Sequence, residues 1–260
     1  MKNFKKKKIG IIGVGVVGGA LASVIPKAIL YDKYKKIGSI EEVNKADIIF
    51  ICVPTPYIKK TGFCLSAVED AFSIIEGSKI LVIKSTVLPG TTEKMQKKYP
   101  QHKVLFNPEF LRAISAKEDM AKPYEQIIGY TKKSKGVDKK VLKILPKAPR
   151  EFIVPSGEAE MTKYFSNAFL ATRVIFANQI YDLCKKLRLN YDLVKEMAGT
   201  NPRIGTSHFD VFYEGYRGYA GACLPKDTKS LIQLGNKVNV DLKLLKIVDK
   251  INKKLLENNK

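Results

Sequence analysis

The sequence predicts an α/β fold, in which a doubly wound parallel sheet is followed by an all-helical region. Two observations predict it. Short apolar segments alternate with segments of helical periodicity over residues 1–154, and this alternation is typical of a parallel sheet with helices on both faces. Residues 156–187 then contain no proline and a single glycine, at position 157, which indicates one long helix. The change of character near Pro155 predicts two domains, residues 1–154 and 155–260.

The expected elements follow in order along the chain. Strands are predicted where apolar residues form short runs, since buried strands of a parallel sheet are apolar on both faces; they lie at residues 8–12, 28–31, 48–54, 79–86 and 103–108. Helices are predicted where apolar residues recur at helical spacing; they lie at residues 13–25, which begin as a turn, and at 41–47, 66–75, 156–187, 192–198, 228–238 and 241–257. Residues 199–226, rich in glycine, proline and aromatic residues, are expected to form a structured loop.

The chain is strongly basic, with a net charge of +21. The basic residues are mostly lysines spread along the whole sequence. Arginine, which supplies much of the bidentate recognition of phosphates and bases, is scarce. No nucleic-acid partner is therefore expected. The lysines are interpreted as solvated surface, and their charge would also attract an anionic small substrate.

Cysteine and histidine usage argues against a metal site. The four cysteines form no C-x-x-C pair and the chain has two histidines, so neither a metal nor disulfides are expected. No apolar run reaches the length that crosses a membrane, and no membrane partner is expected. Residues 1–19 have a basic cluster before apolar residues, as a signal peptide does, but glycines interrupt the apolar part. They are interpreted as the first strand and turn, and a cytoplasmic location is expected.

A glycine motif, Gly13-x-Gly15-x-x-Gly18, lies between the first predicted strand and the first predicted helix. In this context it is typical of a Rossmann-type dinucleotide site. Gly13 allows a tight turn, Gly15 lets a pyrophosphate approach the backbone, and Gly18 lets helix and strand pack closely. Asp32 ends the second predicted strand, where an acidic residue holds ribose hydroxyls and favours NAD over NADP. The alternative is a glycine-rich turn without a ligand.

Polar residues follow several predicted strands. Thr55, Thr86 and Glu109 stand at or just beyond strand ends, and in open parallel sheets ligands bind outside the carboxyl ends of the strands. Glu109 also has apolar neighbours, so its carboxylate could be tuned as a base. Turn formation and helix initiation explain the same residues equally well without a ligand.

Two further groups could carry chemistry. Lys163 and Asn167 are four residues apart on the predicted long helix and share a face, where they could bind an oxygen that gains negative charge. Cys223 lies in a glycine loop, close to Lys226 and Asp227. A nearby positive charge raises the thiolate fraction of a cysteine. The alternatives are a lysine that reaches solvent and a buried, inert cysteine.

Together these motifs resemble the nucleotide-sugar dehydrogenases of the UDP-glucose/GDP-mannose dehydrogenase family, and most closely those that oxidise UDP-glucose at C6. The matching stretches run in family order across nearly the whole chain. They are IGIIGVGVVGG, IIFICVPTP, IKSTVLPGTT, FNPEFLRAISAKEDM, EAEMTKYFSNAFLATRVIFANQI, NPRIG and GYAGACLPKDTKSL. The resemblance implies a two-step oxidation of a sugar C6 alcohol to a carboxylate, in which two NAD molecules each accept a hydride and an enzyme thioester forms.

The resemblance also implies roles for individual residues. Cys223 matches the nucleophile, and Lys163 and Asn167 match the pair that stabilises the oxyanion. Asp227 matches a residue that manages an ordered water as base, Glu109 a glutamate linked to thioester hydrolysis, and Thr86 a threonine near the nicotinamide. The cofactor site would comprise Gly13, Gly15, Val17, Gly18, Asp32, Thr55, Thr86 and Lys226. The substrate site would comprise Phe110, Leu111, Lys163, Asn167, Arg203, Tyr219 and Gly221, where Arg203 can come from a partner subunit.

The sequence departs from the family pattern in three ways. Ala113 stands where relatives have a second glutamate near the cofactor, and Ala220 replaces a glycine of the cysteine loop. Relatives continue with a second Rossmann-like domain that holds the UDP moiety, and this domain is expected to be missing from the chain. The nucleotide would then be held by a separate chain or by a dimer partner, or the substrate would be smaller.

These features leave several functions open. The favoured one is oxidation of UDP-glucose to UDP-glucuronate. A homodimer is expected, because the apolar faces of residues 161–180 and 242–256 need burial. The alternatives are an NAD-dependent dehydrogenase of another sugar or hydroxy acid, and a non-catalytic dinucleotide-binding remnant. The sequence does not identify the sugar, the nucleotide or the oligomer size.

Overall fold

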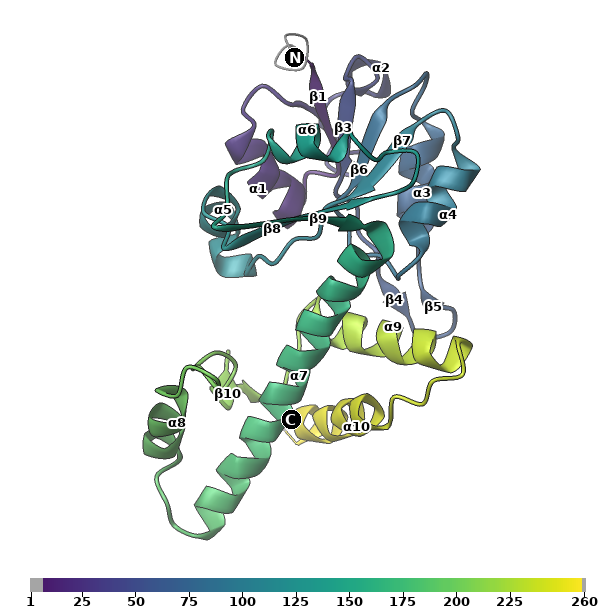
Figure 1. Cartoon of the computed structure of the whole chain (residues 1–260). Helices are drawn as coiled ribbons and strands as arrows, with labels where there is room; N and C mark the ends of the chain where they lie inside the picture. Colours follow the sequence, from purple (N-terminus) through teal and green to yellow (C-terminus); the bar gives the residue numbers. More distant parts are fainter. Residues whose placement is uncertain (1–6, 259–260) are drawn as a thin grey trace. The chain divides into compact units, whose positions relative to one another are not determined.

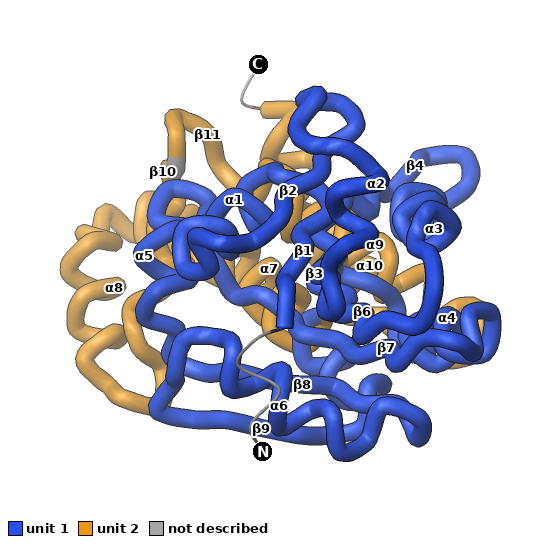
Figure 2. The backbone as a smooth tube through the Cα atoms, turned by 90° about the horizontal axis from the view of Figure 1, so that it is seen from above, with its two compact units in different colours: residues 1–163 blue, residues 164–260 orange. Residues whose placement is uncertain are grey.

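The computed structural model describes residues 7–258. The chain forms two compact units, Met1–Lys163 and Tyr164–Lys260 (Figure 2). The division falls inside helix α7 (Ser156–Lys186), whose first two turns belong to unit 1. The position of this division does not test the predicted domain boundary between residues 154 and 155, which stays a prediction.

Unit 1 is built on a seven-stranded sheet with the strand order β2-β1-β3-β6-β7-β8-β9. The strands are β1 (Ile9–Ile12), β2 (Ile29–Tyr31), β3 (Ile48–Ile51), β6 (Ile80–Ile83), β7 (Lys103–Phe106), β8 (Glu125–Tyr130) and β9 (Arg150–Pro155). A small antiparallel pair, β4 (Tyr57–Ile58) and β5 (Gly62–Phe63), forms outside it. The helical segments are α1 (Val16–Val24), α2 (Ile40–Val43), α3 (Ser66–Ser73), α4 (Thr91–Lys98), η1 (Ala113–Ser115), α5 (Ala116–Ala121) and α6 (Asp138–Leu142).

Helices cover both faces of the sheet, so the prediction of a doubly wound fold is confirmed (Figure 1). One hydrophobic core joins alternate strand residues to α2, α3 and α4, through Val43, Phe72 and Met95. The other core joins the remaining strand residues to α1, α5 and α6. Every residue of β3 and β6 is buried, as expected of strands that are covered on both faces.

The sheet is mixed rather than wholly parallel, which corrects one detail of the prediction. The first five strands run parallel, whereas β8 pairs antiparallel with β7 and parallel with β9. The sequence did not indicate β8 or β9 as strands. Their segments, EQIIGY and REFIVP, mix charged and apolar residues, and β9 lies at the edge of the sheet, where burial is incomplete.

Unit 2 consists of the rest of α7 together with α8 (Tyr191–Gly199), α9 (Leu224–Lys237) and α10 (Lys243–Glu257). The prediction of a helical region is confirmed, with one addition. Within the expected loop, β10 (Phe212–Tyr213) and β11 (Tyr216–Arg217) form a short antiparallel hairpin. Its two turn residues, Glu214 and Gly215, both have positive φ, which matches the type I′ turn that favours two-residue hairpins.

Two small cores hold unit 2 together. One packs Ala171, Val174 and Ile175 of α7 against Tyr219 and Val248. The other surrounds Ala177 and Cys184 with side chains from α8 and the loop that follows it. Over the described residues, none of the helices combines the length and apolarity needed to cross a membrane.

Candidate active site

The glycine turn of unit 1 has the geometry of a dinucleotide site. Gly13 has φ of +88°, and a Cβ atom there would lie 2.7 Å from the carbonyl oxygen of Cys52. A Cβ at Gly18 would lie 1.8 Å from the carbonyl oxygen of Gly13, whereas a Cβ at Gly15 would have nothing within 4 Å. Gly13 and Gly18 are therefore required by the fold, and Gly15 faces open space at the start of α1. These are the three roles that a bound pyrophosphate requires.

Asp32 stabilises this turn from the end of β2. Its carboxylate accepts hydrogen bonds from the backbone N–H groups of Val14 (2.7 Å), Tyr34 and Lys35 (both 3.0 Å). Burial raises the pKa of Asp32, but the three N–H donors lower it by more, so the pKa lies below its ordinary value. Asp32 is thus an anion beside the glycine turn, as a contact to ribose hydroxyls requires.

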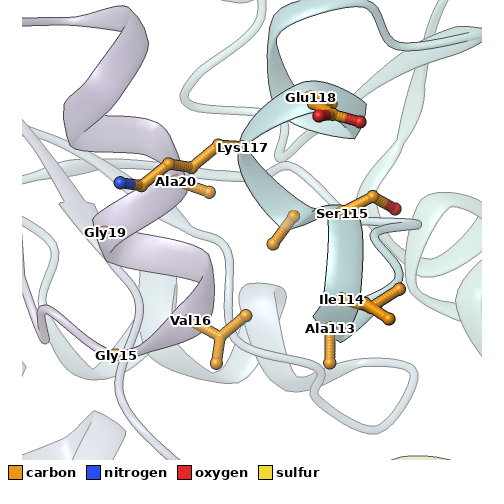
Figure 3. A pocket seen from close by; sticks show the side chains of 10 residues that line it. Gly15, Val16, Gly19, Ala20, Ala113, Ile114, Ser115, Lys117 and Glu118 are labelled. Carbon is orange, nitrogen blue, oxygen red and sulfur yellow. The ribbon is translucent and has the colours of Figure 1, made fainter.

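A pocket of about 440 Å³ opens beside the turn (Figure 3). It is lined by Gly15, Val16, Gly19 and Ala20 at the start of α1 and by residues 113–118 of η1 and α5. Ala113, one of the positions at which the sequence departs from the family pattern, is among the lining residues. Lys117 extends from α5 towards α1 (Figure 3). Lys117 was not predicted from the sequence. A cation next to a helix N-terminus suits a phosphate group.

The predicted strand-end residues Thr55 and Thr86 contact each other. The Thr55 hydroxyl donates a hydrogen bond of 2.7 Å to the carbonyl oxygen of Thr86, and Thr55 is buried. The Ser85 hydroxyl donates to the carbonyl oxygen of Val53 at 2.6 Å. Thr55 thus fixes the backbone at Thr86, which is partly exposed.

Glu109 and Lys163 form a buried ion pair. The Glu109 Oε1–Lys163 Nζ distance is 3.1 Å, and the side chains are 9% and 5% exposed. Glu109 also accepts the Leu111 N–H at 2.8 Å, and Lys163 Nζ lies 5.3 Å from the centre of the Phe110 ring. Burial raises the pKa of Glu109, but Lys163, the Leu111 N–H and Lys84 together lower it below its ordinary value. Glu109 is therefore a carboxylate.

Three buried polar residues near these groups were missed by the sequence reasoning. Lys84 donates to Asn107 Oδ1 at 2.6 Å, and both residues follow strands. Glu160, in the first turns of α7, accepts hydrogen bonds from the Gly90 N–H (2.6 Å), the Thr92 N–H (2.7 Å) and the Thr92 hydroxyl (2.6 Å). It thereby ties α7 to the start of α4. The one available signal for Lys84 was a charged residue inside the apolar segment ILVIKST.

Unit 2 places the predicted cysteine at the start of a helix. Cys223 is the N-cap residue of α9, is exposed, and its carbonyl oxygen accepts the Asp227 N–H at 2.9 Å. The Asp227 side chain is 1% exposed. It accepts a hydrogen bond of 2.5 Å from Asn167 Nδ2 and forms an ion pair with Lys226. Unit 2 thus brings together four of the predicted residues, Asn167, Cys223, Lys226 and Asp227. Lys163 instead pairs with Glu109 in unit 1.

The glycine loop before Cys223 is anchored by α10. Asn252, which is 3% exposed, accepts the Tyr219 N–H at 2.7 Å and donates to the Tyr219 carbonyl oxygen at 2.8 Å. Gly218 and Gly221 have φ of +86° and +76°, a conformation that favours glycine. The Tyr219 side chain lies in a core of unit 2, so its predicted contact with substrate could be made by its backbone only.

We expect the substitution Asn252→Leu to destabilise unit 2 and loosen this loop. It removes both hydrogen bonds, and each buried backbone group left without a partner costs about 1–3 kcal/mol. Urea unfolding measures the loss, with Asn236→Leu as the control because Asn236 is an exposed asparagine of α9. Equal unfolding midpoints for the two variants would contradict the anchoring role of Asn252.

The remaining predicted substrate residues lie in both units. Arg203 is exposed in the loop after α8, and Arg173 donates to the carbonyl oxygens of Ile204 (2.7 Å) and Gly205 (3.2 Å) next to it. Phe110 and Leu111 are partly buried against the two cores of unit 1. Val17, in the first turn of α1, is also partly buried. The roles of all the predicted site residues stay predictions.

Comparison with known proteins shows the family. Two family models match the chain: the NAD binding domain of the UDP-glucose/GDP-mannose dehydrogenase family over residues 19–145, and its central domain over residues 157–254. The first unit thus has the fold of an NAD-binding domain. The chain belongs to the UDP-glucose/GDP-mannose dehydrogenase family, with an NAD-binding domain followed by a central domain.

Individual relatives agree with this. The chain is 36% identical over 224 residues to the UDP-glucose 6-dehydrogenase YwqF of Bacillus subtilis, covering 80% of this chain and 49% of that protein. It is 32% identical over 265 residues to TuaD of the same organism, covering 95% and 55%. A solved UDP-glucose dehydrogenase from Pyrobaculum islandicum matches with a TM-score of 0.84 at 27% identity, covering 98% of this chain and 69% of that one. The chain spans about half the length of the curated relatives it matches.

Proposed function

We propose that this protein is an NAD-dependent dehydrogenase that oxidises the C6 alcohol of UDP-glucose to the carboxylate through a thioester on Cys223. The observation that carries the proposal is the setting of Cys223 in unit 2. An exposed cysteine begins α9, and one turn later a buried aspartate is bonded to Asn167 and Lys226. A cysteine at a helix N-terminus near a lysine is favoured as thiolate. The fold and the UDP-glucose dehydrogenases among the relatives support the choice of UDP-glucose.

NAD fits the glycine turn, because Gly15 leaves space at the start of α1 and Asp32 is an anion beside it. When bound, it would supply the hydride acceptor for both oxidations. Gly13, Gly15, Gly18 and Asp32 would hold it, and Lys117 would face its phosphates. Thr86, fixed by Thr55, would lie at the reacting end in this proposal.

The chain's own residues would perform the remaining steps. In the first oxidation, a base assisted by Asp227 takes the alcohol proton as the hydride leaves C6, which gives the aldehyde. The Cys223 thiolate then adds to the aldehyde carbon, and the new oxyanion is stabilised by Lys163 and Asn167. Loss of the second hydride from this carbon gives the thioester. Glu109 would guide a water to the thioester carbon, after which the C–S bond breaks and releases the carboxylate and Cys223.

The test is the reaction of the purified chain with NAD and UDP-glucose. The proposal expects two NADH per sugar and a uronic acid product. One NADH per substrate, without acid, would replace it with a simple alcohol dehydrogenase. NADH binding without any turnover of UDP-glucose or of other nucleotide sugars would overturn the proposed activity and favour a non-catalytic dinucleotide-binding protein.

We further propose that the protein forms a homodimer through α7. Large apolar side chains are exposed along this helix in unit 2, at Phe165, Phe169, Phe176 and Leu183, and Leu187 is exposed directly after its end. Exposed apolar patches of this kind mark interaction sites. Sedimentation velocity is expected to give a dimer, and Phe176→Glu with Leu183→Glu is expected to shift it to monomer. A monomeric wild-type protein would contradict this proposal.

A further inference from the structure

Lys84 is a buried lysine to which the proposed mechanism gives no part. It directly follows β6, is 2% exposed, and donates a hydrogen bond of 2.6 Å to Asn107 Oδ1. Asn107 is fully buried and is itself fixed, because its Nδ2 donates to the carbonyl oxygen of Ile127 at 2.8 Å. The pairing of Ile83 with Phe106 places Lys84 and Asn107 at neighbouring strand ends. The position of the ammonium group is therefore determined by the sheet.

The charged and titratable groups around Lys84 come from three directions. Cys52 follows β3, Glu109 follows β7, and Lys163 lies on α7 within unit 1. Burial raises the pKa of the Cys52 thiol to about 12, so Cys52 contributes no charge near neutral pH. Glu109 is the carboxylate paired with Lys163 at 3.1 Å. The cluster thus contains two ammonium groups, those of Lys84 and Lys163, and one carboxylate, that of Glu109.

The net charge of this cluster affects how strongly it can stabilise an oxyanion. A carboxylate paired one-to-one with Lys163 would cancel most of the ammonium charge in a buried setting, where electrostatic interactions are strong. A developing oxyanion is stabilised by preorganised donors and by positive charge that is already in place, and a cation contributes less when a carboxylate already neutralises it. Lys84 also acts on Glu109, since its ammonium contributes to the lowered pKa of that carboxyl.

We propose that Lys84 is a positioning residue for the proposed oxidation: as a second buried cation, fixed on Asn107 two residues before Glu109, it leaves the Lys84–Glu109–Lys163 cluster with a net positive charge. This inference rests on the proposed function, because the charge serves an oxyanion beside Lys163. Burial lowers the pKa of Lys84 to about 8, and Lys163 adds to the effect, although Glu109 opposes it. The net positive charge is consequently lost as pH rises above about 8.

The test separates the charge of Lys84 from its hydrogen bond. Lys84→Gln keeps an N–H donor for Asn107 but removes the charge, and Lys84→Arg keeps a charge. Lys79→Gln is the matched control: Lys79 precedes the other end of β6, and its Nζ donates to the carbonyl oxygen of Asn44 at 2.7 Å. If Lys84→Gln does not fold, Lys84→Met, which is closer in shape to lysine, replaces it.

The first readout needs no substrate. The carboxyl resonance of Glu109, assigned with Glu109→Gln in protein carrying ¹³C-labelled glutamate, is titrated in each variant. We expect Lys84→Gln to raise the pKa of Glu109, because the substitution removes a nearby opposite charge. Lys79→Gln should leave it unchanged, and Lys84→Arg should keep it close to the wild-type value. An unshifted Glu109 pKa in Lys84→Gln would overturn the role of Lys84.

The second readout is the pH profile of kcat. In Lys84→Gln, kcat is expected to fall about 10- to 100-fold with little change in KM, and its acidic limb should move to higher pH together with the Glu109 pKa. Lys84→Arg should recover most of the rate. A wild-type protein inactive towards nucleotide sugars would overturn the proposed function, and with it the catalytic part of this inference. An active wild type whose pH profile is the same in Lys84→Gln would overturn the inference alone.

Discussion

Cys223→Ser is expected to abolish formation of the sugar acid while leaving NADH binding unchanged. The serine hydroxyl is almost wholly protonated near neutral pH, so it cannot replace a thiolate as nucleophile. Loss of a catalytic nucleophile lowers kcat by about 10³-fold or more. The measurement is NADH production with product analysis, together with the affinity for NADH from its fluorescence. Because Cys223 is an exposed N-cap residue, the substitution should leave the unfolding midpoint close to that of the wild type.

The control for Cys223 is another cysteine of the same chain. Cys64 lies near the surface of unit 1, and the hydrogen bonds from Ser66 lower the pKa of its thiol. A second thiol with a lowered pKa is therefore present, and the proposed mechanism gives it no part. Cys64→Ser should retain full activity. If Cys223→Ser still produced the acid at the wild-type rate, the thioester route would be ruled out and an oxidation without a covalent intermediate would replace it.

The parts of the fold that the sequence predicted are those encoded in local pattern. The segments around β3 and β6 are continuous apolar runs, and such runs signal strands that are buried on both faces. The strand β9 has no such signal, because four of its residues are exposed at the sheet edge. Strand direction also has no local signature, which is why the reversal at β8 was not predicted.

The residues of the candidate site also differ in whether local sequence pattern encodes them. The glycine turn and Asp32 could be predicted because their roles follow from conformations and spacings within one strand–helix unit. The contacts of Lys84 with Asn107 and of Tyr219 with Asn252 join residues 23 and 33 positions apart. Their partners are set by strand order and helix packing, and no local pattern encodes these. Buried polar contacts of this kind emerge only when the elements are assembled.

The two substitutions Gly15→Ala and Gly18→Ala are expected to separate ligand binding from stability within one motif. A methyl group at Gly15 would meet no atom within 4 Å, and its backbone φ of −78° is accessible to alanine. Gly15→Ala should therefore fold with an unfolding midpoint close to the wild type. Its methyl group would occupy the space that the pyrophosphate needs, so we expect the Kd for NADH to rise by about 100-fold, or roughly 3 kcal/mol.

Gly18→Ala should have the opposite consequence. Its Cβ would lie 1.8 Å from the Gly13 carbonyl oxygen and 3.2 Å from Cys52 Cβ, so α1 would have to move away from β1. Overpacking of this kind costs about 1–3 kcal/mol, and more where backbone must shift. Urea unfolding measures the loss. Gly157→Ala is the control, because a Cβ there also has nothing within 4 Å. Gly157 also lies far along the chain from the glycine turn. If Gly15→Ala were destabilised as much as Gly18→Ala, or bound NADH as tightly as the wild type, the space at Gly15 would not be the cofactor's, and the assignment of the turn to NAD would fail.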